Sequence, residues 1–277
     1  MSSFARLPPD MFVYYLDTNV WGSLVKNKST SNSCIDFFQS RDRVAALSYF
    51  TLFELSRASN MLDEFDELFF AMRNDIRIPC LYDQVVEGEV ENYPNEWEMR
   101  WLPLSILVDE TQPNILSKFA SDTKFIKSRD EHFQFGREQF MSLKQLKENF
   151  PSESDDEYST DEADFFAWCN TVDYLGRHFP RFLLRFKGSA NTLNIDSLLS
   201  LRIRSLFIFY KYYIHDQSPG RTDFLDFAHV SYAPYCHAYV TERNVYNVLM
   251  RIKNSGLMLS KTQPIHITKF LRKICRG

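Results

Sequence analysis

Five acidic residues lie at the ends of predicted strands or in the helices that follow them. Asp17 comes directly after the apolar run FVYYL, and Glu54 follows a second run, RVAALS, within one or two helical turns. Glu242 follows a third run, CHAYVT, while Asp223 and Asp226 stand at i and i+3 in the first turn of a predicted helix. Because ligands of open parallel sheets bind beyond the carboxyl ends of the strands, we expect these acids to meet at one edge.

Clustered carboxylates repel one another, so their gathering indicates a cation. Mg²⁺ and Mn²⁺ take oxygen ligands, keep several waters, and bind through a few carboxylates and substrate phosphate. Such a metal lowers the pKa of a bound water and steadies the leaving oxygen of a phosphodiester. The pattern therefore predicts metal-assisted phosphodiester hydrolysis, with these candidate ligands: Asp17, Glu54, Asp223, Asp226 and Glu242.

The order of the predicted elements indicates an α/β fold built on a parallel sheet. Residues 11–75 alternate strand, helix, strand and helix, and the same kind of pattern returns in residues 216–277. Residues 76–215 are predicted as a mostly helical insertion, interrupted by an acidic loop at 151–164. We therefore expect one discontinuous domain, 11–75 with 216–277, that carries the insertion.

Local signals mark several helix ends. Ser48 is placed to cap a helix with apolar spacing through residues 49–74, and Thr222 is placed to cap another. Gly256 is a suitable residue to end the helix that follows the third strand. A final short strand and helix are expected within PIHITKFLRKI.

Several segments resemble the motifs of PIN-domain nucleases. YYLDTNVW resembles the opening motif of the family, LSYFTLFELSRA the second, and DFLDFAHVSYAPYCHAYVTERN the third and fourth, in the family's order. The resemblance implies a three-layer α/β/α fold with Mg²⁺ or Mn²⁺ as cofactor and RNA as substrate. It does not extend to the long middle of the chain.

The resemblance also assigns the first three acids of the site. Asp17 matches the first metal-binding acid and Asn19 the polar residue behind it, while Glu54 matches the second acid. Asp226 matches the third acid, and Asp223, one turn earlier, is its rival or its partner.

The fourth corner of the site stays open. Glu242 follows Thr241 directly, whereas Asn244 lies three residues after it, and many family members place an Asp two residues after the Thr. Substrate-orienting roles are expected for the polar residues around the acids: Asn19, Thr241, Asn244 and His229.

Simpler interpretations stand beside these. The Asp17-Thr18-Asn19 segment could form an Asx-turn or a helix cap. Asp223, Asp226 and Glu242 could only favour the dipoles of their helices.

The charge distribution bears on nucleic-acid binding. The net charge of −4 points to no particular partner, but no acid occurs from Arg243 to the C-terminus. Lys269, Arg272 and Lys273 fall at i, i+3 and i+4 of the last predicted helix, so they share a face that could meet phosphates. An ordinary solvated helix face explains them equally well.

We expect a cytoplasmic protein without a membrane span. The N-terminus lacks the apolar core of a signal peptide, and no apolar stretch reaches 18 residues. Five widely spaced cysteines with no C-x-x-C pair fit a reducing compartment.

The sequence thus favours a metal-dependent endoribonuclease, with a toxin or defence role as a weaker inference. Two alternatives remain open: a catalytically inactive PIN-like protein-interaction module, and a structure-specific DNA nuclease. An inhibitory partner protein and a homodimer are both compatible with the first interpretation.

Overall fold

The computed structural model describes residues 4–39, 42–107, 111–149, 158–186, 192–220 and 222–276 of the chain. Residues 151–157 of the acidic loop expected at 151–164 lie outside these residues, and residues 160–164 already belong to a helix that begins at Thr160.

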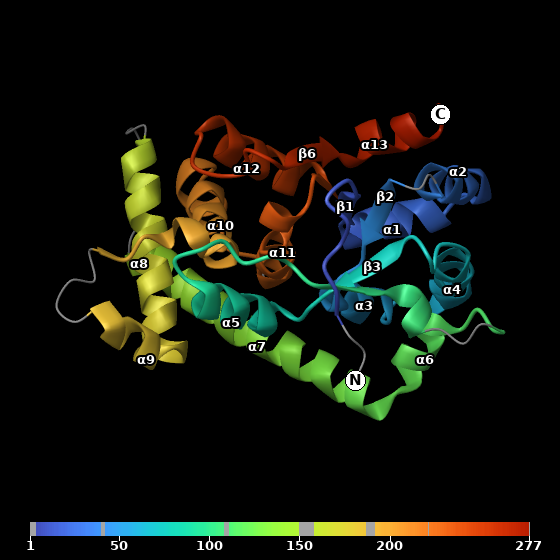
Figure 1. Ribbon diagram of the computed structural model, residues 1–277, viewed down its shortest axis with the longest axis horizontal. Coiled ribbons are helices and arrows are strands. Elements are labelled where there is room, and N and C mark those ends of the chain that lie inside the picture. Colours follow the sequence, from blue (N-terminus) through green and yellow to red (C-terminus); the bar gives the residue numbers. More distant parts are fainter. Residues whose placement is uncertain are drawn as a thin grey trace.

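A six-stranded, mostly parallel sheet forms the centre of the molecule (Figure 1). Its strands lie in the order β4-β3-β2-β1-β5-β6, and within this sheet β4 alone runs antiparallel to its neighbour. They are β1 (Phe12–Leu16), β2 (Arg43–Ala46), β3 (Ile76–Pro79), β4 (Trp101–Pro103), β5 (Ala238–Thr241) and β6 (Gln263–His266). The expected α/β fold on a mainly parallel sheet is therefore confirmed.

The direction in which strands are added reverses at the centre of the sheet. β2 pairs with one side of β1, and β5, from the far end of the chain, pairs with the other. Such a reversal leaves a crevice beyond the carboxyl ends of the two strands, which is where open α/β sheets bind ligands.

Helices cover both faces of the sheet, because alternate side chains of each strand point to opposite faces. Val13 and Tyr15 belong to one hydrophobic core, and Tyr14 and Leu16 belong to another.

The first core is completed by helices α5 (Tyr82–Asn92), α8 (Thr160–His178), α9 (Pro180–Leu183), α10 (Leu199–Phe209), α11 (Asp223–Val230) and α12 (Arg243–Asn254). The second is completed by helices α1 (Thr18–Val25), α2 (Lys28–Phe38), α3 (Tyr49–Leu55), α4 (Leu62–Ala71), α6 (Ile115–Ser121) and α13 (Ile267–Ile274). The long helix α7 (Thr123–Asn149) contributes Leu143 to the first core and Phe125 to the second.

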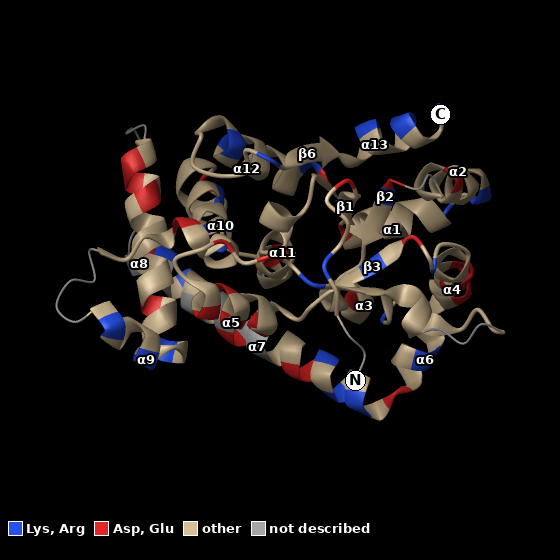
Figure 2. Ribbon diagram, in the orientation of Figure 1, with Lys and Arg blue, Asp and Glu red and all other residues tan. Residues whose placement is uncertain are grey.

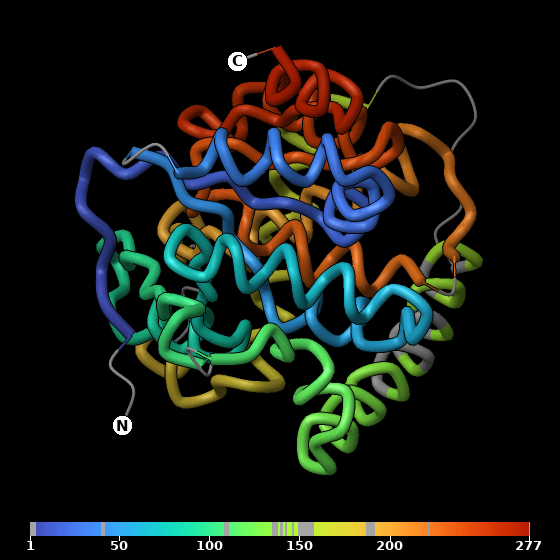
Figure 3. The backbone as a smooth tube through the Cα atoms, turned by 90° about the vertical axis from the view of Figure 1, so that its right-hand side faces the viewer, coloured from blue at the N-terminus to red at the C-terminus, as the bar shows by residue number. Residues whose placement is uncertain are grey.

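The two ends of the chain pack together. β5 and β6 extend the sheet beside β1, and α13 contacts α2 (Figures 1 and 3). No helix of the described segments has both the length and the apolar character needed to cross a membrane.

Some elements differ from the sequence prediction. Residues 49–74 form not one helix but two, α3 and α4, joined by a 3₁₀ turn at Ser59–Met61. The hydroxyl of Ser56, just after α3, donates to the carbonyl of Phe53, and bonds of this kind compete with helix continuation. Helix α1, directly after Asp17, was not predicted.

The range 76–215 contributes two strands, β3 and β4, as well as helices. A π-helix, Tyr210–Ile214, extends α10 at the end of this range. The division of the chain into two domains stays a prediction, but the sheet includes residues from both sides of it.

A buried carboxylate ties this range to the C-terminal part of the chain. Glu89 on α5 is fully buried and accepts hydrogen bonds from the Ser200 backbone N–H (2.7 Å), the Ser200 hydroxyl (2.7 Å) and the Tyr235 hydroxyl. Burial raises the pKa of Glu89 to about 7, although these bonds oppose the rise.

Replacing Glu89 by Gln should therefore stabilise the protein at pH 8 and leave it unchanged near pH 4. The folded pKa lies above the ordinary value of 4.5, so the parent loses stability as pH rises from 4.5 to about 7. Gln does not ionise, and its amide can donate to the Ser200 hydroxyl while its oxygen accepts the other two bonds. At ~1.4 kcal/mol per pKa unit, the gain is up to about 3 kcal/mol.

Urea unfolding of both proteins at pH 4 and pH 8 measures this difference. Glu87→Gln, on the exposed side of α5, is the matched control and should show little change. An equal effect of Glu89→Gln at both pH values would contradict the prediction.

Candidate functional site

Asp17 lies where β1 meets α1, at the reversal point of the sheet. Its side chain is buried, with the residue 6% exposed. One carboxylate oxygen accepts the Thr18 backbone N–H (2.7 Å) and the other accepts the Thr241 hydroxyl (2.6 Å). Asp17 is the N-cap of α1, so the simpler interpretation holds locally. The cap does not exclude a further role, since each oxygen keeps a second lone pair.

Glu54 lies on α3 close to Asp17 and forms an ion pair with a buried histidine. The Thr18 hydroxyl donates to Glu54, and Nε2 of His229 lies 2.7 Å from the same carboxylate oxygen. On the other side of the ring, Nδ1 lies 2.6 Å from the Tyr15 hydroxyl, which donates to Ser48 (2.8 Å). With Tyr15 donating to Ser48 and a carboxylate at Nε2, both ring nitrogens have an acceptor, an arrangement that favours the protonated imidazole.

The pKa shifts agree with a charged pair. Burial raises the pKa of Glu54, but the hydrogen bond and charge of His229 outweigh it, so the pKa lies below its ordinary value. Burial lowers the pKa of His229, but the bond to Glu54 and the charges of Glu54, Asp17 and Asp226 outweigh it, so this pKa is raised.

Asp223 and Asp226 share a buried lysine. Nζ of Lys211, in the π-helix, lies 3.0 Å from Asp223 and 2.7 Å from Asp226, and the Lys211 side chain is 7% exposed. Asp223 also accepts the Tyr212 hydroxyl (2.7 Å). The pKa of Asp226 is raised to about 6 by burial and by the charges of Asp17 and Asp223, although Lys211 acts in the opposite direction.

The structure does not decide between Glu242 and Asn244 for the fourth position of the site. Glu242 is exposed at the N-terminus of α12 and accepts a hydrogen bond from the Asn19 amide (3.0 Å). Asn244 is exposed in the first turn of α12. Thr241 is fully buried, so its hydroxyl orients Asp17 and does not face solvent.

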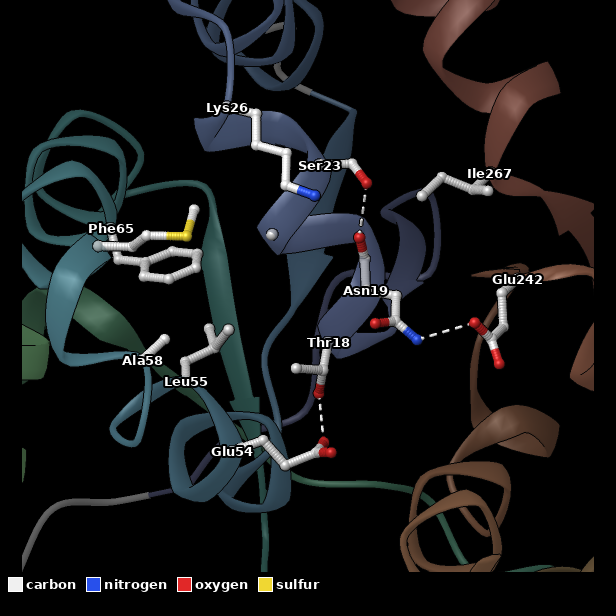
Figure 4. Close-up of a pocket in the computed structure, with 12 residues that line it drawn as sticks. Thr18, Asn19, Ser23, Lys26, Glu54, Leu55, Ala58, Phe65, Glu242 and Ile267 are labelled. Atoms are coloured by element: carbon white, nitrogen blue, oxygen red, sulfur yellow. Dashed lines mark hydrogen bonds between the residues drawn. The ribbon is translucent and has the colours of Figure 1, made fainter. Parts of the chain in front are cut away.

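A pocket of about 470 Å³ opens beside these acids (Figure 4). Helix α1 provides one wall, α3 and the segment leading into α4 provide the opposite wall, and Glu242 and Ile267 close a third side. It is lined by Thr18, Asn19, Gly22, Ser23, Lys26, Glu54, Leu55, Ala58, Met61, Phe65, Glu242 and Ile267.

The basic residues of α13 lie on the helix that begins at the pocket edge with Ile267 (Figure 2). Lys269 and Arg272 are exposed. Lys273 instead donates to the Tyr14 hydroxyl (3.0 Å) and lies over the Tyr14 and Phe37 rings. The three residues thus do not act as one free cationic face.

Sequence reasoning missed two groups that shape this site. Lys211 stood in the apolar run SLFIFYKYYI, where the available signal was that a lysine within a buried helix needs an acidic partner. His132, on α7, packs on Phe50 with ring centroids 4.6 Å apart. Burial and the nearby charge of His229 lower the pKa of His132 to about 4, so it is neutral at pH 7.

The donor atoms fit a hard divalent cation in type and charge, but they are not gathered around one point. Among the described residues, no three His, Cys, Asp or Glu side chains form a group able to hold a metal. Four carboxylates, those of Asp17, Glu54, Asp223 and Asp226, face two cationic side chains, Lys211 and His229. A cation would balance this charge, and a shared position requires Lys211 to release Asp226.

Comparison of the chain with protein-family models, with curated proteins and with solved structures finds no match. The resemblance to PIN-domain nucleases therefore stays a prediction.

Replacing His229 by Gln should cost most stability between pH 4.5 and pH 6.5, the ordinary pKa values of Glu and His. Because the pKa of His229 is raised, its protonation contributes stability below pH 6.5, and this contribution is lost as pH rises through the folded pKa. Because the pKa of Glu54 is lowered, its ionisation contributes stability above pH 4.5, and this contribution is lost as pH falls through the folded pKa. Within the window the loss is roughly 3 kcal/mol.

Thermal unfolding across pH 3 to 9 tests the shape of this window. His178→Gln, at an exposed position of α8, serves as control and should give a flat, small difference. A His229→Gln effect that is constant with pH would show that the pair is not ionic.

Proposed function

We propose that this protein is a metal-dependent phosphodiesterase that cleaves RNA and has a PIN-like fold. The observation that supports this most is that Thr18 bonds both Asp17 and Glu54, while Asp226 lies close enough for the charge of Asp17 to act on its pKa. His229 links Glu54 to the helix that carries Asp226. The order of the four sequence motifs along this α/β framework adds support.

Asp17, Asp226 and Glu54 would hold Mg²⁺ or Mn²⁺, with Asp223 or Glu242 as further ligands. The metal, when bound, would supply an activated water and charge stabilisation at the phosphate. The protein's own groups prepare the acids for this task. Thr241 and the Thr18 N–H fix the Asp17 carboxylate, His229 fixes Glu54, and Asn19 holds Glu242.

A second candidate function has one specific observation in its favour. Asp226 and Glu54 already have cationic partners, Lys211 and His229, so the acids can persist without a metal. Under that alternative the protein is a catalytically inactive PIN-like module that binds other proteins. Metal binding decides between the two.

Asp17→Asn should abolish Mn²⁺-dependent RNA cleavage while the fold stays intact. The Asn amide can accept the Thr18 N–H and donate to the Thr241 hydroxyl, so both hydrogen bonds of the side chain survive. Asn is also as good a helix cap as Asp. We expect a loss of at least about a hundredfold in cleavage rate, with an unchanged or higher melting temperature.

Cleavage of labelled single-stranded RNA and DNA, with the melting temperature of each protein, measures both effects. Asp10→Asn, at an exposed position before the amino end of β1, is the charge-matched control. RNA cleavage by Asp17→Asn at the parent's rate would exclude the metal-site proposal, and preferential DNA cleavage by the parent would replace RNA as substrate.

Lys211→Met should make the site more dependent on a divalent cation. Loss of the ammonium leaves Asp223 and Asp226 without their shared partner, which costs about 3 to 5 kcal/mol without metal. If the acids bind Mn²⁺, saturating metal restores part of this, about 2.7 kcal/mol at a hundred times the Kd.

Calorimetric unfolding with EDTA, Mn²⁺ and Ca²⁺ provides the comparison. The parent should gain less from Mn²⁺ than Lys211→Met does. If neither protein is stabilised by either metal, the interaction-module alternative is favoured.

A further inference from the structure

We infer that the pocket beside Asp17 holds one unpaired nucleobase of the nucleic-acid strand, that Lys26 takes a neighbouring phosphate, and that Gly22 sets the size of the base. This inference rests on the proposed function, since it names the substrate subsite of the same site. It concerns the parts of the pocket lined by α1 and by apolar side chains, not the parts lined by Glu54 and Glu242.

One wall is a stripe along helix α1. Thr18, Gly22 and Lys26 recur every four residues and therefore lie on one face of the helix. Thr18 lies at the acidic end, where it bonds Glu54, and Lys26 lies at the other end. Lys26 is the C-cap residue of α1, eight positions after Thr18, which is roughly 12 Å at about 1.5 Å per residue. The pocket thus leads from the acids to a cation.

The opposite wall is apolar. Ala58 and Met61, from the turn between α3 and α4, are half-buried there, and Leu55 and Phe65 lie behind them almost fully buried. On the other side of α1, Ile267 adds an apolar group beside Glu242 (Figure 4). Apolar pocket surface of this kind can take the flat face of a base. The volume of about 470 Å³ lies within the range of small-ligand sites.

The polar groups match the remaining parts of a nucleotide. Lys26 is exposed, and no ion pair to it is found in the described segments, so its ammonium is available to phosphate. In Figure 4 the Asn19 amide nitrogen points to Glu242, which leaves the amide oxygen as an acceptor for a base edge. A ligand with an apolar face, a hydrogen-bonding edge and an anionic group would match the apolar side chains, the Asn19 amide oxygen and the Lys26 ammonium. Because paired bases have neither their faces nor their edges free, the occupant is an unpaired base.

Gly22 keeps the floor of the pocket open. A Cβ atom added at this position meets no heavy atom within 4 Å. The backbone φ of Gly256 is in the left-handed region that favours glycine, whereas the φ of Gly22 is not. A glycine inside a helix costs about 1 kcal/mol relative to alanine. The fold therefore tolerates a side chain at position 22. A larger residue there would fill the part of the pocket above Gly22.

The test measures RNA binding separately from cleavage. Fluorescence anisotropy of labelled oligo(U) and oligo(A) is recorded with Asp17→Asn protein in EDTA, alone and combined with Gly22→Ala, Gly22→Leu or Lys26→Gln. We expect Gly22→Leu to weaken binding about tenfold, which is within the range for loss of one stacked base. Gly22→Ala should weaken oligo(A) more than oligo(U), while raising the melting temperature.

Two further arms test the phosphate and the need for an unpaired base. Lys26→Gln should weaken both RNAs equally and reduce the slope of log affinity against log salt by about one. Duplex RNA should bind more weakly than either single strand, and Gly22→Leu should not change its affinity. Gly176→Leu is the matched control, at an exposed helical glycine of α8 where an added Cβ makes an ordinary contact with Leu183 (3.7 Å), and it should bind as the parent does.

The outcomes separate this inference from the proposed function. If Gly22→Leu binds oligo(U) and oligo(A) as the Asp17→Asn protein does, or if that protein binds neither, the base pocket is excluded whether or not RNA is cleaved. If Gly22→Leu abolishes binding but the native protein cleaves no RNA with Mn²⁺, the pocket stands and the proposed function fails.

Discussion

The structure depends on how four carboxylates are kept beside one another in a mostly buried place. Asp17, Glu54, Asp223 and Asp226 would repel strongly without counter-charges, and the fold supplies Lys211 from the π-helix and His229 from α11. Two cationic side chains face four carboxylates, and burial together with the charges of Asp17 and Asp223 raises the pKa of Asp226. Within the protein, Asp223 and Asp226 thus share Lys211, and Glu54 has His229.

The acids and the pocket arise from the same break in the chain. Helix α3 ends at Leu55, and the next α-helix begins only at Leu62. Glu54 therefore lies beside the other acids, whereas Ala58 and Met61 line the apolar side of the pocket. A continuous helix through residues 49–74 would carry these side chains along one straight face. The interruption therefore places Glu54 on one helix and the apolar side chains of Ala58 and Met61 on the turn that follows it.

Much of the framework could be predicted from sequence, because short apolar runs that end in polar residues indicate buried strands. Parallel strands then bring their carboxyl ends to one edge of the sheet. That reasoning led to Asp17, Glu54 and Glu242. It did not lead to β3 and β4, because the alternation Ile76-Arg77-Ile78 covers only three residues and β4 itself has only three. Nor could it assign Lys211, because its partners lie beyond the end of its helix and only packing brings them close. The simple interpretation of Asp17 as a helix cap and the functional one both fit the structure.

The pairing of β1 with β5 has a consequence for how the chain matures during synthesis. The Asp17–Thr241 hydrogen bond joins residues 224 positions apart, and Glu54 meets His229 across 175. Until β5 emerges from the ribosome, β1 has an unpaired edge, which is prone to aggregation. The acids likewise lack their histidine until α11 has been made. A nascent chain of this protein therefore carries an unfinished site until α11 and β5 have been made.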